Sequence, residues 1–358
     1  MPSLPGMRAG GYYDQHSSGQ RASIEAVFGW IDALLPGIPA QAADRPFAMA
    51  DFGCSEGANS LRIVAHVRRA LAALGQGDRL WATFNDLPSN NFNRLFDNLA
   101  RQELLPAQKP GLYHAAVAGS FYGPLLPRHS LQFGLSFNSL VWLDQLPPAP
   151  VPDFVIYPGP TPHRADVQVS AAAVAAFAEQ ARSDLLRFLA ARADELVPGG
   201  KLLVCVPARD AGHSTSEGLY DLLHDSCVDM VRRGLLDEQA YRDFVMPVYF
   251  RRLDEMVDPL AGVPHLAERL AVERAEIVYV ATPFVDEFRR TGDRAIYAEA
   301  FVGFLQAFSE PVLRAGLPSA ESVDVVASIY DRARERLRVE PERYPFEYIQ
   351  AACVYARR

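Results

Sequence analysis

The stretch from Met49 to Asn59 (MADFGCSEGAN) constrains the fold more than any other part of the sequence. It overlaps an apolar run, Phe47 to Ala50, of the kind that forms a buried strand of a parallel sheet. Small residues then form a turn around Gly53 and Gly57, and apolar residues recur at helical spacing from Leu61 to Leu71. A strand, tight turn and helix place the turn at the carboxyl edge of the sheet, where α/β proteins bind ligands.

The turn differs from the dinucleotide-binding pattern G-x-G-x-x-G, because Asp51 precedes the first glycine and only two glycines are present. An acidic side chain there suits a cationic ligand better than a pyrophosphate. The ammonium and sulfonium groups of S-adenosylmethionine fit that description. Taken alone, the turn is equally typical of an ordinary strand–helix junction whose glycines serve packing, so the choice of ligand depends on the rest of the chain.

The composition describes an ordinary globular protein. The chain has 358 residues, enough for one elaborated domain, and 49% of them are hydrophobic. A formal net charge of −8 gives no electrostatic reason to bind nucleic acid. No apolar run reaches the length of a membrane span, and the first residues lack the apolar core of a signal peptide. We therefore expect neither nucleic acid nor a membrane as partner.

The cysteines and histidines indicate a reducing compartment and no metal site. Four cysteines are scattered along the chain without a C-x-x-C pair, which is typical of a reduced cytoplasmic protein. The eight histidines show no metal-like spacing. We therefore predict a cytoplasmic location and no metal ligands.

Strands alternate with helices through the first 207 residues, each break being marked by Gly or Pro. This alternation predicts a doubly wound, mostly parallel α/β sheet. Residues 1–20 are expected to be a mobile arm. The predicted strands are 47–51, 78–86, 113–120, 131–136 and 201–207, and the predicted helices are 23–35, 60 onward, 91–103 and 170–196.

The pattern changes after residue 210. Helices and irregular links fill 211–264, and further helices are predicted at 296–313 and 323–339. A late strand at 275–283 and a terminal strand at 347–356 are expected to form an antiparallel pair. We predict that 211–264 with 296–320 forms a helical cap over the carboxyl edge of the sheet. The α/β core would then comprise residues 1–210, 265–295 and 321–358.

Four motifs follow one another along the chain: ADFGCSEGAN, FNDLPSNNFNRLF, GSFYGPLLP and SLVWLDQLP. As a set they resemble the SABATH family of S-adenosylmethionine-dependent methyltransferases, which includes plant salicylate, benzoate, jasmonate and indole-acetate carboxyl methyltransferases and the caffeine-pathway enzymes. ELVPGGKLLV, FVMPVY and SEPVL extend the resemblance over nearly the full chain. The resemblance implies a Rossmann-like class I methyltransferase fold and a homodimer, and the Ala- and Arg-rich composition suggests a bacterial member.

The resemblance implies a site for S-adenosylmethionine, with S-adenosylhomocysteine as product. Asp51 and its neighbours would hold the methionine end, and the Asp86 carboxylate would accept hydrogen bonds from two ribose hydroxyls. Phe121 would offer a flat apolar face to the adenine. The implied cofactor residues are Tyr13, Ser17, Asp51, Gly53, Cys54, Asn59, Asp86, Leu87, Ser120 and Phe121.

The resemblance also implies that Gln20 and Trp142 donate hydrogen bonds to a substrate carboxylate through their amide and indole N–H groups. A carboxylate is ionised near pH 7 and attacks the sulfonium methyl without a general base, so catalysis depends mostly on in-line positioning. We therefore predict methyl ester formation on a small aromatic or lipophilic acid. The predicted substrate residues are Gln20, Asn138, Val141, Trp142, Leu219, Tyr220, Tyr249, Leu305, Phe308 and Phe346.

Three departures from the family pattern keep alternatives open. Asn138 replaces a common tyrosine and Val141 replaces a histidine or methionine, so N-methylation of a heteroaromatic ring is an alternative. Val245 replaces an asparagine that binds magnesium in some members, which argues against a magnesium ion here. A non-catalytic relative that retains cofactor binding is the second alternative.

Overall fold

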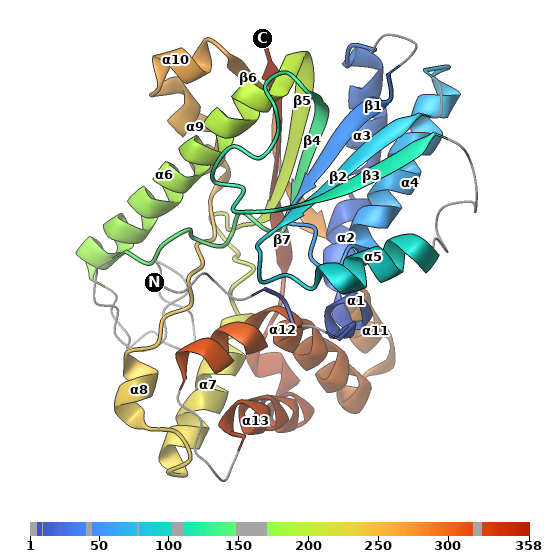
Figure 1. Cartoon of the computed structure of the whole chain (residues 1–358). Coiled ribbons are helices and arrows are strands. Elements are labelled where there is room, and N and C mark those ends of the chain that lie inside the picture. Colours follow the sequence, from blue (N-terminus) through green and yellow to red (C-terminus); the bar gives the residue numbers. More distant parts are fainter. Residues whose placement is uncertain are drawn as a thin grey trace.

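A seven-stranded mixed sheet forms the centre of the protein, in the strand order β3-β2-β1-β4-β5-β7-β6 (Figure 1). The computed structural model describes residues 6–8, 10–40, 45–76, 79–101, 111–147, 170–317 and 324–358. The strands are β1 (Phe47–Phe52), β2 (Leu80–Asp86), β3 (Leu112–Ala118), β4 (Leu131–Phe137), β5 (Leu196–Pro207), β6 (Leu270–Val280) and β7 (Tyr348–Arg357).

Strands β1 to β5 pair in parallel with their neighbours, and β7 runs antiparallel between β5 and β6. This confirms the predicted doubly wound, mostly parallel sheet with an antiparallel pair at its C-terminal end. The central strand β4 is buried along its whole length, because strands flank it and apolar side chains cover both faces. The edge strand β3 is more exposed.

Helices cover the two faces of the sheet. On one face, apolar side chains of α2 (Ser18–Glu25), α3 (Phe28–Leu34) and α4 (Ala58–Ala73) pack on β1, β2 and β4. On the other face lie α6 (Ala171–Glu195) and α9 (Leu253–Ala261). The remaining short elements are η1 (Leu35–Gly37), α5 (Phe92–Arg101), α10 (Pro264–Ala267) and η2 (Pro341–Arg343). None of the helices in the described ranges has the length and apolar character needed to cross a bilayer.

A group of helices gathers at one end of the sheet (Figure 1). It contains α7 (Leu219–Arg232), α8 (Glu238–Arg242), α11 (Pro283–Thr291), α12 (Arg294–Gly316) and α13 (Val325–Val339). Helix α13 packs on α12 and α7, although the sequence-based division assigns it to the core. Helix α9 packs on α6, β6 and β7, although the same division assigns it to the cap. The contacts of α13 and α9 thus differ from the sequence-based division, and the residue boundaries between core and cap stay a prediction.

The N-terminal stretch differs from the predicted mobile arm. It forms helix α1 (Tyr12–His16) and then α2, in which Gln20 is buried. Close packing on α12 explains this, because a Cβ atom added to Gly19 would lie 2.8 Å from the Phe304 ring. The single helix predicted at 23–35 is divided into α2 and α3, and strand β5 begins at Leu196, before the Pro-Gly-Gly expected to precede it.

Gly218 allows the chain before α7 to pass close to the segment that enters β7. Its φ is +68°, and an added Cβ would lie 1.9 Å from the carbonyl oxygen of Pro345. Gly234 has a similar φ of +70° but nothing within 4 Å of the added Cβ. An alanine at Gly234 would therefore introduce backbone strain alone, whereas an alanine at Gly218 would introduce the same strain and a steric clash.

We predict that Gly234→Ala lowers the free energy of unfolding by about 1 kcal/mol. This is the usual cost of placing a residue with a Cβ atom in the left-handed backbone conformation. Gly218→Ala should cost about 3 kcal/mol or more, because the methyl group also displaces backbone atoms. Urea denaturation of both variants measures the difference. Equal losses would contradict the close contact between Gly218 and Pro345.

Candidate active site

Two adjoining pockets lie where the loops after the parallel strands meet the cap helices. The smaller pocket is lined by the turn after β1 and the start of α4. The larger pocket, of ≈ 240 Å³, is lined by the loops after β2, β3 and β4 and by side chains of α7 and α12. The residues that line both pockets are Tyr13, Gln20, Gly53, Phe137 and Asn138.

Asp51 is the buried charged group of the smaller pocket, which partly exposed Asp14 also lines. It lies near the end of β1 and is 5% exposed. Its Oδ2 accepts a hydrogen bond of 2.5 Å from the Ser60 hydroxyl, whereas no described residue donates to Oδ1. Burial raises the pKa of the Asp51 carboxyl to about 6, the Ser60 hydrogen bond lowers it and the nearby charge of Asp86 raises it. A buried carboxylate with one free oxygen suits an ammonium group.

Gly53 brings the turn after β1 against the loop after β4. Its φ is +93°, and an added Cβ would lie 2.0 Å from the Ser139 hydroxyl oxygen. That hydroxyl donates to the Gly53 carbonyl oxygen at 3.2 Å and to the Phe137 carbonyl oxygen at 3.0 Å. A side chain at Gly53 would separate the two loops and widen the passage between the pockets.

Asp86, at the end of β2, is the charged group shared between the turn and the larger pocket. Its Oδ2 accepts from the Ser55 backbone N–H at 2.6 Å, and its Oδ1 accepts from the Leu87 N–H at 2.8 Å. Burial raises the pKa of the Asp86 carboxyl to about 6, while these two hydrogen bonds lower it. Each oxygen keeps a further lone pair, so the carboxylate can accept from two neighbouring hydroxyl groups.

A buried arginine holds the loop after β3. Arg192, on α6, donates to the carbonyl oxygens of Phe121 at 2.9 Å and Gly123 at 3.0 Å. It also pairs with Glu195 at 2.8 Å, and Glu195 accepts from the Leu125 N–H at 2.7 Å. Burial lowers the pKa of the Arg192 guanidinium, against the attraction of Glu195. Our sequence reasoning missed this pair, although two charged residues three positions apart on an apolar helix face were a visible signal.

The loop that carries Trp142 is fixed at several points. The Trp142 carbonyl oxygen accepts a hydrogen bond from the Tyr122 hydroxyl at 2.5 Å, and the Trp142 backbone pairs with that of Val248 in an antiparallel bridge. The buried guanidinium of Arg251 donates to the Leu140 carbonyl oxygen. Within the described part of the chain, no group accepts a hydrogen bond from the indole N–H, and the ring lines the larger pocket. The indole N–H is therefore available to a ligand.

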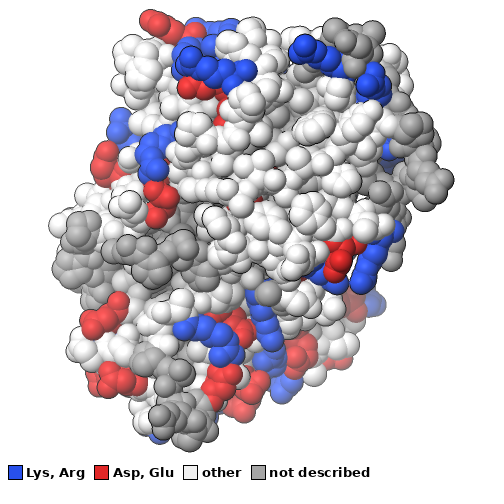
Figure 2. Space-filling view, viewed as in Figure 1, with Lys and Arg blue, Asp and Glu red and all other residues white. Residues whose placement is uncertain are grey.

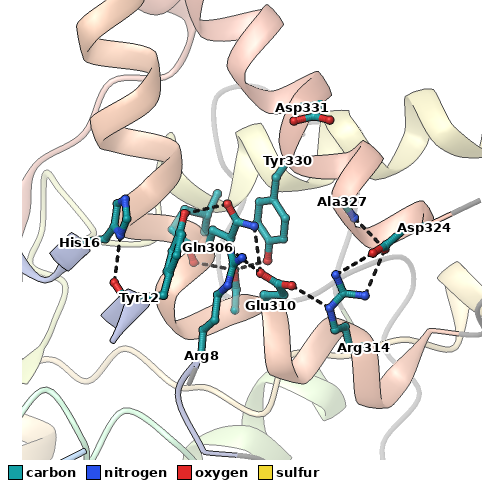
Figure 3. A network of polar contacts seen from close by, with 12 residues as sticks. Arg8, Tyr12, His16, Gln306, Glu310, Arg314, Asp324, Ala327, Tyr330 and Asp331 are labelled. Atoms are coloured by element: carbon teal, nitrogen blue, oxygen red, sulfur yellow. Dashed lines mark hydrogen bonds and ion pairs between the residues drawn. The ribbon is translucent and has the colours of Figure 1, made fainter. Parts of the chain in front are cut away.

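The N-terminal segment is fastened to α12 beside the pockets (Figure 3). The Arg8 guanidinium stacks 3.7 Å from the centroid of the Tyr12 ring and pairs with Glu310 at 2.8 Å. The Tyr12 hydroxyl donates to the Gln306 side-chain oxygen at 2.9 Å. These contacts hold the next residue, Tyr13, at the wall of both pockets.

Comparison of the chain with known proteins identifies the family to which it belongs. The sequence pattern of the SAM dependent carboxyl methyltransferase family matches residues 7–357. The chain belongs to this family. The predicted relationship to the SABATH enzymes is thereby confirmed, and S-adenosylmethionine (SAM) is the methyl donor of this methyltransferase.

Relatives with different acceptors are similar to the chain over most of its length. Indole-3-acetate O-methyltransferase 1 of Oryza sativa subsp. japonica is 30% identical over 98% of the chain and 91% of that protein. Gibberellic acid methyltransferase 2 of Arabidopsis thaliana is 28% identical over 96% and 89%. A 3,7-dimethylxanthine N-methyltransferase of Camellia sinensis var. assamica is 27% identical over 81% and 76%.

A solved structure shows the same fold. Loganic acid methyltransferase with SAH has a TM-score of 0.75 to this structure and 23% sequence identity, and the match covers 99% of this chain and 98% of that chain. The likeness supports the sheet, the cap and their arrangement as a methyltransferase fold.

The residues present fit SAM. The free oxygen of Asp51 can accept from its ammonium group, and the paired oxygens of Asp86 can accept from its ribose hydroxyls. Leu87, Ser120 and Phe121 line the pocket beside Asp86, where an adenine ring could lie. Among the residues that the structure describes, no group of three His, Cys, Asp or Glu side chains could hold a metal ion.

The structure brings most of the predicted site residues together. Cys54 and Asn59 line the smaller pocket, and Asn59 donates to the Ser17 hydroxyl at 3.1 Å, so Ser17 lies just behind the wall. The predicted substrate residues that line the larger pocket are Gln20, Asn138, Val141, Trp142, Leu219, Tyr220 and Phe308.

Three predicted substrate residues do not line either pocket. The Tyr249 hydroxyl donates to Glu255 at 2.7 Å, and Leu305 is fully buried in the core of the cap. Phe346 packs behind the wall, with its ring centroid 5.7 Å from that of Phe304. Phe304 itself lines the larger pocket, and its position four residues before Phe308 on α12 was a signal that we missed.

We predict that affinity for S-adenosylhomocysteine falls as the pH drops through 6. Binding favours ionised Asp51 and Asp86, and both carboxyl groups take up protons near pH 6 in the unliganded protein. For each group, the dissociation constant should rise about tenfold from pH 7 to pH 5. Calorimetry across this range measures the change. Asp51→Asn should bind more weakly at pH 7 and respond less to pH; an equally steep response would contradict the role of Asp51.

Proposed function

We propose that this enzyme converts the carboxylate of a small aromatic or lipophilic acid into its methyl ester. One observation carries the proposal. Among the described residues that line the larger pocket there is no lysine, arginine or histidine, and the donors that face it are neutral. Such a pocket orients an anion without neutralising it, so the anion keeps its nucleophilicity towards the cationic methyl donor.

The proposed reaction needs no proton transfer. A carboxylate oxygen forms the new bond to the methyl carbon, the bond from that carbon to sulfur breaks, and its electron pair stays on the sulfur of S-adenosylhomocysteine. We propose that Gln20 and Trp142 donate hydrogen bonds from their N–H groups to the carboxylate of the acid. These bonds would hold the attacking oxygen in line with the bond between the methyl carbon and sulfur. Asp144, the carboxylate at the wall near Trp142, pairs with Arg187 at 2.8 Å, so it is a poor general base.

The wall of the larger pocket favours an apolar acceptor with one negative charge. The Phe308 ring lies 6.5 Å from Trp142, 6.4 Å from Tyr220 and 5.6 Å from Phe304, measured between ring centroids. These rings offer flat apolar contacts to a ring or chain. The described wall residues include no cation that would pair with a second carboxylate, so we propose monocarboxylic acids over dicarboxylic ones.

The relatives support an acid but also name the alternative. Two of those compared act on indole-3-acetate and gibberellic acid, according to their names, and one methylates a nitrogen of dimethylxanthine. A ring N–H must lose a proton during methylation, and the acidic groups of the described pocket wall, Asp86 and Asp144, already accept hydrogen bonds from backbone N–H groups or pair with Arg187. This arrangement favours the acid.

Labelled SAM tests the proposal against a panel of benzoate, salicylate, indole-acetate, jasmonate-like and fatty acids, with dicarboxylates and xanthines as controls. We expect a methyl ester from at least one monocarboxylic acid. Transfer to a xanthine nitrogen with no ester from any acid would instead establish the N-methyltransferase. Binding of cofactor without any transfer would indicate a non-catalytic relative.

We predict that Trp142→Phe lowers kcat/KM for the acid about tenfold or more, because it removes one hydrogen bond to a charged group and keeps an aromatic ring. The dissociation constant of S-adenosylhomocysteine should change less than twofold. Trp30→Phe is the matched control, since Trp30 lies on α3 outside both pockets, with the Arg274 guanidinium 3.6 Å from its ring centroid. An equal loss in both variants would argue against the role of the indole N–H.

We also propose a cytoplasmic homodimer. All four cysteines are free and buried, as suits a reducing compartment. Trp81 on β2 and Tyr113 on β3 stack with ring centroids 6.2 Å apart, and both are 42% exposed. Figure 2, viewed as in Figure 1, shows few charged side chains over the part of the molecule where β2 and β3 lie. Light scattering tests this face: Trp81→Glu should halve the measured mass, and a wild-type monomer would contradict the dimer.

A further inference from the structure

We propose that Asn138 is a positioning residue that sets the place of Gln20 through the Ser23 hydroxyl, with Tyr348 and Gln350 holding the Asn138 amide. The inference rests on the proposed function, because it concerns the residue proposed to orient the acid. It differs from the sequence-based expectation that Asn138 itself contacts the substrate.

Asn138 lies at the junction of the two pockets and lines both. It follows β4 directly and has a left-handed backbone, with φ +60°. Asparagine tolerates this conformation better than most residues. Its backbone N–H donates to the Cys205 carbonyl oxygen of β5 at 2.8 Å, so its main chain is anchored to the sheet.

The side-chain amide of Asn138 is already engaged. Its Oδ1 accepts from the Tyr348 hydroxyl at 2.8 Å and from the Gln350 amide at 2.9 Å, both on β7. Its Nδ2 donates to the Ser23 hydroxyl oxygen at 3.2 Å. Two donors from β7, which is paired on both sides by β5 and β6, therefore fix the carbonyl end of the amide, and the NH₂ end points to α2.

Ser23 passes this contact on to Gln20. Ser23 is 1% exposed, and its hydroxyl donates to the Gln20 carbonyl oxygen at 2.8 Å while it accepts from Asn138 Nδ2. The hydroxyl oxygen also lies 3.3 Å from Asn138 Oδ1, but its one hydrogen is directed to Gln20 in the shorter bond, so donor and acceptor roles run in one direction from Tyr348 to Gln20. Hydrogen bonds arranged in this way strengthen one another in a low-dielectric interior.

The side chain of Gln20 depends on this support. It is 5% exposed and lines both pockets, yet its Oε1 has no hydrogen-bond partner among the described residues. Its place is therefore set by the backbone of α2 rather than by bonds of its own amide. The close approach of Gly19 to the Phe304 ring of α12 also limits the movement of α2.

The consequence lies in the in-line geometry of methyl transfer. A displacement of about 1 Å in a group that orients the substrate can cost a hundredfold in rate. Removal of the Ser23 hydroxyl should let α2 shift and misplace the Gln20 donor. The cofactor site should change little, because Asp51 and Asp86 are fixed by Ser60 and by backbone N–H groups.

A double-mutant cycle tests the inference. Ser23→Ala and Asn138→Ala are each made in the wild type and in Gln20→Ala, and kcat/KM for the acid is measured with the affinity for S-adenosylhomocysteine. We expect each single variant to lose about tenfold in kcat/KM, with cofactor affinity changed less than twofold. In the Gln20→Ala background the further loss should be below twofold, because the residue acted upon is absent.

Ser226→Ala is the matched control. Ser226 is fully buried in α7, and its hydroxyl donates to the Leu222 carbonyl oxygen at 2.7 Å, so it loses a similar bond outside both pockets. Its activity should match the wild type. Equal losses with and without Gln20 would overturn the inference, as would a parallel loss of cofactor affinity in Ser23→Ala. Ser23→Ala decides the matter if Asn138→Ala fails to fold.

The product formed by the wild-type enzyme distinguishes a failure of this inference from a failure of the proposed function. Ester formation by the wild type supports the proposed function whatever the cycle shows. If the wild type methylates a ring nitrogen instead, the proposed function fails, and the same cycle with that acceptor still decides whether Asn138 acts through Gln20.

Discussion

Burial of negative charge at the ends of β1 and β2 is the constraint on which the site depends. Asp51 and Asp86 have raised pKa values because the protein has removed them from water, and Asp51 is left with one oxygen that no described residue satisfies. Such an arrangement is unfavourable in the empty protein and becomes favourable when a cation arrives. The sheet supports it because both groups lie at the ends of strands whose backbones are fixed by their neighbours.

The surrounding loops are held by buried polar groups rather than by apolar contacts alone. Arg192 holds the loop after β3, and Arg251 with Tyr122 holds the loop that carries Trp142. A loop has many carbonyl groups that need partners when buried, and a guanidinium supplies several donors from one position. The loops that line the larger pocket therefore keep their shape without regular secondary structure of their own.

Much of the fold could be predicted from the sequence, because apolar runs and Gly or Pro breaks report on burial and turns. The doubly wound, mostly parallel sheet and its antiparallel last strand pair followed from this and from the family resemblance. The motifs also brought Asp51, Asp86 and Trp142 to one place. Contacts between distant segments could not be predicted: nothing near Gly19 in the sequence announces Phe304, and no local pattern joins Asn138 to Tyr348. These depend on how the cap and the last strand meet the sheet.

The sharing of wall residues between the two pockets has a consequence for how such an enzyme can change its acceptor. A substitution at Tyr13, Gln20 or Asn138 alters the walls of both pockets at once. Leu219 and Phe308 lie on the cap helices, whereas Asp51 and Asp86, the proposed cofactor contacts, lie at the ends of β1 and β2. Substitutions that adapt the enzyme to new acceptors should therefore accumulate on the cap helices. Libraries of variants at cap positions should leave binding of the methyl donor intact.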